Sequence, residues 1–297
     1  MGLTDYPNGV TSFGMPMVGG GMPMKRHAAK YYFVDGLIGR DGADGLSPAN
    51  SFATIAKAIT VVNARIDWAA SPWATSDVIV VAPGVYAENL TSLPYGATII
   101  GLGDAFDGDG EKGVQINPVA GSPVDVSTFI NSKIQNVAFE SADTDPVFDA
   151  ETLNNVQLIH CVFKGAPDAT TSTAGIITFD SVNLTVRDCL IQFVDCGIDF
   201  VYSDANDSFN RGLIQNNVIT YCSEAGIRVG VNLVSVSSHI DGNLIDGGSG
   251  TLTIGIDLNI ATPKTFVSRN IISADTGIQG ATTGTYVGGN YVNGALE

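Results

Sequence analysis

Charged side chains at one position of a repeated block are the first candidates for chemistry in this sequence. Asp199, Arg228 and Asp257 stand in successive copies of a block that contains Gly-Ile. If the copies stack as strands, the two aspartates lie two layers apart, about 10 Å, near the upper end for an inverting glycoside hydrolase. Arg228 stands between them, so an Asp-Arg-Asp ion ladder on a surface strand is the simpler interpretation. We therefore expect no enzymatic activity and keep these three residues as the best candidates if the protein is an enzyme.

An acidic segment is the second candidate, and its chemistry would be calcium binding. Its four carboxylates within eight residues are those of Asp104, Asp107, Asp109 and Glu111. Calcium takes six to eight oxygen ligands, but the spacing is not that of an EF-hand. An exposed loop without metal is the favoured interpretation, and Asp41, Asp44 and Glu88 leave the same two possibilities open. We expect no metal or other cofactor, with Ca²⁺ as the alternative.

Histidine and cysteine form no known catalytic or metal-binding motif. The histidines are His27, His160 and His239, and the cysteines are Cys161, Cys189, Cys196 and Cys222. The sequence has no CxxC pair, no HExxH, no serine elbow and no glycine-rich phosphate loop. We expect the histidines of the repeat to be strand-face residues and the cysteines to be buried in a protein made in a reducing cytosol.

Two short blocks recur through residues 77–297, and they predict the architecture that positions these side chains. The fourth positions of the first block are 20 to 28 residues apart, and they are Val137, Cys161, Cys189, Asn217, Asn243, Asn270 and Asn290. A second block with Gly-Ile follows each of the middle copies, and no helix separates the two. A period in the twenties with two strand blocks predicts an all-β, single-stranded parallel β-helix of roughly nine coils.

The asparagines of the first block predict a structural ladder. Asn217, Asn243, Asn270 and Asn290 are expected to point inward and to hydrogen-bond the backbone of the coils above and below. Cys161 and Cys189 share their register and are expected to behave as small buried hydrophobes.

Two segments precede the repeat. Residues 31–76 predict a capping strand, a loop and a helix over Ser51–Ile66, with Asn50 or Ser51 as the N-cap. Residues 1–30 are rich in Gly and Pro, so no regular element is expected. We interpret them as an extended anchoring arm, with a disordered start as the alternative. The anchoring side chains are expected to be Tyr6, Phe13, Met15, Met17 and Val18.

Four motifs resemble the opening of pectate-lyase-like right-handed β-helix proteins. They are Tyr32-Phe-Val-Asp-Gly, Asp44-Gly-Leu-Ser-Pro, Ser51-Phe-Ala-Thr-Ile and Ile79-Val-Val-Ala-Pro-Gly-Val-Tyr-Ala-Glu88. The resemblance implies a right-handed coil whose open N-terminal end is capped by the helix. The fold hosts lyases, hydrolases, adhesins and virion proteins, so it does not decide the function. The segment Thr4–Pro16 resembles the leading motif of some structural proteins of tailed bacteriophages.

The balance of charge limits the partners. With 14 Lys and Arg against 30 Asp and Glu, the formal net charge is −16, which argues against nucleic acid. No apolar run reaches the ~18 residues of a membrane span, and the first residues do not resemble a secretory signal.

These observations lead to one expected function and one alternative. We expect a structural virion protein of a tailed bacteriophage, a head decoration or spike protein assembled in the host cytoplasm. Its expected partners are the capsid or other virion proteins, two further copies in a homotrimer, and a surface glycan. The alternative is a tailspike-like protein that binds or degrades polysaccharide.

Overall fold

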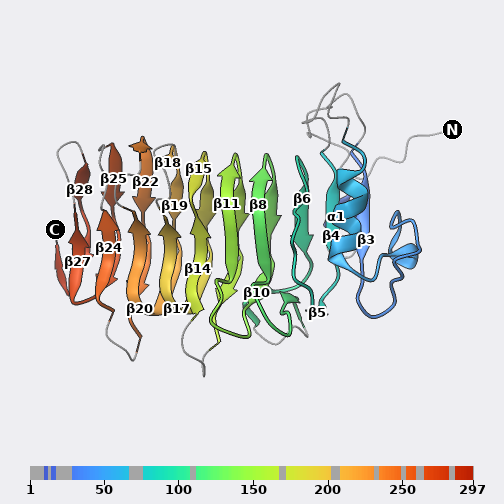
Figure 1. The fold of residues 1–297 in the computed structure, drawn as a ribbon, viewed down its shortest axis with the longest axis horizontal. Coiled ribbons are helices and arrows are strands. Elements are labelled where there is room, and N and C mark those ends of the chain that lie inside the picture. Colours follow the sequence, from blue (N-terminus) through green and yellow to red (C-terminus); the bar gives the residue numbers. More distant parts are fainter. Residues whose placement is uncertain are drawn as a thin grey trace.

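The computed structural model is a right-handed parallel β-helix, a rod in which each coil stacks on the one before (Figure 1). The predicted fold class is therefore confirmed. The structure describes residues 10–12, 15–17, 29–66, 76–107, 112–166, 172–201, 208–230, 234–248, 252–258, 264–280 and 285–296. Within these ranges no helix is long and apolar enough to cross a membrane.

Ten parallel strands form the first face of the rod. They are β3 (Tyr31–Val34), β4 (Val78–Val81), β6 (Thr98–Gly101), β9 (Lys133–Gln135), β12 (Gln157–Ile159), β16 (Thr185–Arg187), β19 (Leu213–Gln215), β22 (Ser238–Asp241), β25 (Thr265–Ser268) and β28 (Tyr286–Gly288). Side chains alternate between the two sides of a strand. Ile99 and Ile134 therefore point into the core, whereas Thr98 and Lys133 point outward.

An 18-stranded sheet forms the other two faces, because β17 (Leu190–Phe200) and β20 (Val218–Val229) continue around a corner. Phe193 and Tyr221 turn that corner with positive φ angles of 59° and 56°. The second face comprises the first parts of β17 and β20 with β5 (Gly84–Tyr86), β7 (Val114–Ile116), β10 (Ala138–Glu140), β13 (Val162–Lys164), β23 (Leu244–Asp246), β26 (Ile271–Ser273) and β29 (Tyr291–Val292).

The third face comprises the last parts of β17 and β20 together with five other strands. These are β8 (Val124–Ile130), β11 (Phe148–Asn154), β14 (Ser172–Thr178), β24 (Ile254–Leu258) and β27 (Thr276–Gln279). Three short strands, β15 (Asp180–Val182), β18 (Ser208–Asn210) and β21 (Val234–Val236), lead back towards the first face. The last strand, β30 (Ala295–Leu296), pairs antiparallel with β29.

The asparagine register lies at the corner between the first and second faces. Asn243 is buried; its amide donates to the carbonyl of Ile214 (3.0 Å) and to Asn270 Oδ1 (2.9 Å). Its own Oδ1 accepts from the backbone N–H of Asn217 (3.0 Å). Each asparagine thus satisfies groups of the neighbouring coils that the strand ladders do not reach. Cys189 occupies the same register, and its thiol donates to the carbonyl of Leu158 at 3.5 Å.

The glycine of the second block is required by a close approach inside the coil. A Cβ on Gly226 would lie 2.3 Å from Ile245 Cγ2 and 2.7 Å from the carbonyl oxygen of Gly255. The core side chain of one coil therefore fills the space beside this glycine in the preceding coil. This close packing explains why Gly-Ile recurs in the second block.

The capping helix is shorter than expected. It runs over α1 (Ile55–Asn63) with Thr54 as the N-cap, so the prediction of a start at Ser51 with an Asn50 or Ser51 cap is wrong. A short 3₁₀ helix, η1 (Pro48–Asn50), precedes it. Phe52 cannot join the helix because its backbone pairs with Phe33 and Asp35 of the first coil. The helix packs against β3 and β4 at the N-terminal end of the rod (Figure 1).

The segment before residue 30 contains a short hairpin. Strand β1 (Val10–Ser12) pairs antiparallel with β2 (Met15–Met17), so the expectation that this segment has no regular element is wrong. Of the predicted anchoring residues, Tyr6, Phe13 and Val18 lie outside the described residues.

Candidate functional site

The third face carries a column of outward-pointing side chains, one from each of seven coils. In order they are Asp125, Asp149, Ile177, Asp199, Arg228, Asp257 and Gln279. The block alignment predicts the last four at one register, and the structure places them there. Acidic side chains thus gather on one face of the rod.

Arg228 binds the carboxylates around it. Its guanidinium lies 3.3 Å from Asp199 Oδ2 and 2.8 Å from Glu224 Oε2. Asp257 is buried and stands beside Arg228 on the next coil. Burial raises the pKa of the Asp199 carboxyl, and the positive charge of Arg228 opposes that rise. Arg228 thus forms ion pairs with Asp199 and Glu224 and stands between Asp199 and Asp257 in the column.

Asp125 and Asp149 form a carboxylate pair that the sequence analysis missed. They stand side by side on β8 and β11, Asp125 exposed and Asp149 half-buried. Burial, followed by the negative charges of Asp125, Glu151 and Asp145, raises the pKa of Asp149 to about 6. Such a pair can hold or exchange a proton near neutral pH. Their coils lack the Gly-Ile signature, so the block alignment had no signal with which to place them.

The predicted calcium ligands are not assembled in the described residues. Asp109, Glu111 and the side chain of Asp107 lie outside that part, while Asp104 accepts a hydrogen bond from the N–H of Phe106 (2.9 Å). Across the described ranges no cluster of three or more His, Cys, Asp or Glu side chains could hold a metal.

The other ambiguous acidic residues stabilise the N-terminal cap. Asp41 accepts from the N–H groups of Ala53 and Thr54, and Glu88 accepts from those of Ile55 and Ala56, at 2.9 to 3.0 Å. The first turn of a helix leaves such N–H groups without partners, so Glu88 caps α1, whereas Asp41 binds the two residues that lead into it. Asp44 accepts from the N–H of Leu46 in a local turn.

The histidines of the repeat pack against aromatic rings, His160 edge-on and His239 stacked. His160 lies 4.5 Å from Phe106, and His239 lies 4.8 Å from Phe266, each measured between ring centroids. They come from separate coils, and His27 lies outside the described residues. All four cysteines are free thiols and buried.

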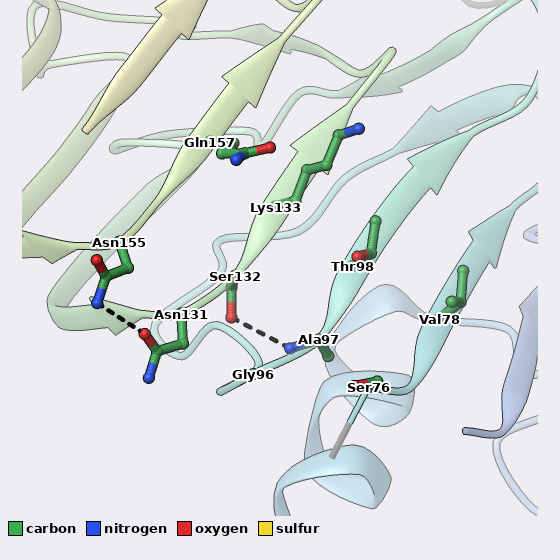
Figure 2. Close-up of a pocket in the computed structure, with 10 residues that line it drawn as sticks. All are labelled: Ser76, Val78, Gly96, Ala97, Thr98, Asn131, Ser132, Lys133, Asn155 and Gln157. Atoms are coloured by element: carbon green, nitrogen blue, oxygen red, sulfur yellow. Dashed lines mark hydrogen bonds between the residues drawn. The ribbon is translucent and has the colours of Figure 1, made fainter. Parts of the chain in front are cut away.

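A polar hollow of about 650 Å³ lies where the strands β4, β6, β9 and β12 of the first face begin (Figure 2). Its lining residues are Ser76, Val78, Gly96, Ala97, Thr98, Asn131, Ser132, Lys133, Asn155 and Gln157. Thr98, Lys133 and Gln157 stand in one row on neighbouring strands. Asn155 donates to Asn131 Oδ1 (2.9 Å) at the corner beside them.

Lys133 is the distinctive residue of this hollow. Burial and the positive charge of Arg187 lower the pKa of its ammonium group. Within the described part of the chain this ammonium has no hydrogen bond or ion pair. A half-buried ammonium beside amide and hydroxyl groups can bind hydroxyl oxygens or an anionic group of a ligand.

Comparison with known proteins shows the fold and no family. No protein-family model matches the sequence, and no curated protein is significantly similar to it. Pectin methylesterase PemA from Erwinia chrysanthemi is similar in structure, with a TM-score of 0.50 and 13% identity over 91% of this chain and 92% of that one. A pectin methylesterase in complex with hexasaccharide VII has a TM-score of 0.47, also at 13% identity over 91% and 92% of the two chains. At this identity the likeness to PemA shows a shared parallel β-helix and nothing about activity.

Proposed function

We propose that this protein is a structural component of a tailed-bacteriophage virion, a rod held on the head by its N-terminal segment. The observation that carries the proposal is the position of the first strand of the rod. Strand β3 is the terminal strand of the first face, so residues 29 and 30, which precede it, lie at one end of the rod (Figure 1). An N-terminal segment that joins the rod at its end can hold that end while the rest extends away.

The composition of the segment supports this role. It contains all five methionines, with Tyr6, Phe13 and Val18 among glycines and prolines that let a chain follow an irregular groove. Burying such side chains on a shell is favourable, and ordering the segment opposes it. The rod supports the role in a second way, because Arg228 forms an ion pair with Asp199, one of the two carboxylates that the sequence suggested for an enzyme.

The test is a truncation that removes residues 1–24. Heads purified from the encoding phage are mixed with the full chain or with the truncated chain, and bound copies are counted by quantitative gel densitometry. We expect the truncated rod to keep its circular dichroism spectrum and to lose binding. A matched control, Asp125→Asn with Asp149→Asn in the full chain, changes the third face only and should bind normally. If the truncated rod decorates heads at full occupancy, the anchoring role is wrong.

A second candidate function is carbohydrate binding, and the hollow around Lys133 favours it. Sugar hydroxyls both donate and accept, as do the amides of Asn131 and Gln157. We expect Lys133→Met to weaken binding to any glycan that the wild type recognises on an array by at least tenfold. Lys57→Met, on α1 and not among the residues that line the hollow, is the matched control. A wild type that binds no glycan, or binding that survives Lys133→Met, removes this candidate.

A further inference from the structure

An apolar stripe runs along the second face of the rod. Its members occupy one outward register position in consecutive coils and are Ala138, Val162, Leu190, Val218, Leu244, Ile271 and Tyr291. We propose that this stripe is a self-association surface, on which a second copy of the chain lies with its long axis parallel to the first. The inference does not rest on the proposed virion role.

Another segment of the chain covers the first part of the stripe. Ala105, in the 3₁₀ turn η2 (Ala105–Asp107), packs on Ala138 and Val162, and all three are buried. The cover ends near Leu190, which is partly buried. Beyond it the exposed fractions rise to 39% for Val218, 42% for Leu244, 54% for Ile271 and 48% for Tyr291. The stripe is therefore buried at Ala138 and Val162 and bare from Val218 to Tyr291, and contiguous bare apolar surface is typical of an interface.

The charges around the stripe permit two acidic chains to approach each other. The next outward positions on the second face are Lys164, Gln192, Thr220, Asp246 and Ser273. Lys164 is neutralised by Glu140 at 3.0 Å. The aspartate column lies on the third face instead, so two chains of net charge −16 repel each other less when their second faces meet than when their third faces meet. An apolar centre with a polar rim is the usual composition of a protein interface.

A second copy is the partner whose spacing matches the stripe. Neighbouring members are about 4.8 Å apart, the distance between adjacent strands. Another β-helix of the same sequence presents the same repeat, so side chains can interdigitate in every coil along the contact. If the stripe lies at a rotation axis parallel to the rods, each of its residues is at the same height as its counterpart in the second copy and lies close to it.

The first experiment measures the oligomeric state of the full chain by light scattering after size-exclusion chromatography. We expect the wild type to be an oligomer and the double variant Leu244→Asp with Ile271→Asp to have the mass of one chain. Phe266→Asp is the matched control, because Phe266 is also 42% exposed but lies on the first face. Circular dichroism checks that each variant keeps its fold. A monomeric wild type, or a double variant that remains oligomeric, overturns the proposal.

The second experiment tests the parallel arrangement and does not depend on disrupting the interface. Cysteine is placed singly at Val218, Leu244 or Ile271, and a mild oxidant is added; the native cysteines are all buried. In a parallel assembly each of the three variants forms a disulfide with its own counterpart, whereas Phe266→Cys does not. Cross-linking at one position only indicates an antiparallel pair, and cross-linking at none of the three shows that the stripe is not the contact. Either result overturns the parallel arrangement.

Discussion

Replacing Asn243 with alanine tests how much the buried asparagine ladder contributes to the stability of the rod. The side chain takes part in four hydrogen bonds: to the carbonyl of Ile214, to Asn270 Oδ1, and from the backbone and side-chain amides of Asn217. Alanine leaves the Asn217 N–H buried without its acceptor, which costs about 1–3 kcal/mol. The three other lost bonds cost about 0.5–1.5 kcal/mol each, so we expect a loss of about 5 kcal/mol in the free energy of unfolding.

The loss should be local, because a solenoid coil contacts mainly its neighbours. Hydrogen exchange followed by mass spectrometry reads it directly, since the Asn217 amide should exchange far faster in the variant than in the wild type. Asn243→Cys should fall between the two, because Cys189 shows that a thiol at this register still donates to a carbonyl.

The matched control is Gln157→Ala, which removes an exposed amide from the first face and should change stability by less than about 0.5 kcal/mol. If Asn243→Ala costs no more than this control and leaves exchange at Asn217 unchanged, the reasoning about the ladder is wrong.

Three further changes test the third face and the core. The pKa of Asp149 in the folded state is about 6, above its unfolded value of about 3.9. The folded state therefore binds more protons between these two pH values, and the protein loses stability as the pH rises through them. Asp149→Asn should raise the melting temperature at pH 7.5 and not at pH 3. Arg228→Met leaves the largely buried carboxylate of Asp199 without its cation and should cost about 1–3 kcal/mol in the free energy of unfolding by urea. Adding Asp199→Asn should recover most of this loss. If it recovers none, the ion pair is not the cause of the loss. Gly226→Ala forces a Cβ against Ile245 and should cost about 1–3 kcal/mol, and a melting temperature equal to that of the wild type would contradict the packing argument.

The repeat determines the fold at the level of sequence. The sequence repeats an asparagine, at positions 217, 243, 270 and 290, and a Gly-Ile block at a regular spacing. Each coil must satisfy the same corner and pack the same core position, so the same residue types return at the same spacing. A single sequence therefore predicts the parallel β-helix, the inward asparagines and the register of Asp199, Arg228 and Asp257.

Tertiary structure alone decides which of the irregular residues meet. From the sequence alone, the carboxylates of Asp41 and Glu88 could bind either a cation or the N-terminus of a helix. Only their position at the start of α1 shows that they accept hydrogen bonds from the backbone N–H groups there. Helix α1 begins later than its apolar stripe suggests because pairing of the Phe52 backbone with the first coil competes with helix formation. Asp125 and Asp149 are 24 residues apart in coils without the repeated signature, so only stacking shows that they pair.

The bare half of the apolar stripe is also a tertiary property. Val162 and Leu244 have the same residue class, register and strand pattern, and nothing near either residue in the sequence separates them. Val162 is buried because Ala105, two coils earlier in the chain, folds across its coil. Leu244 remains exposed, because whether a side chain is covered depends on segments that are distant from it in the sequence.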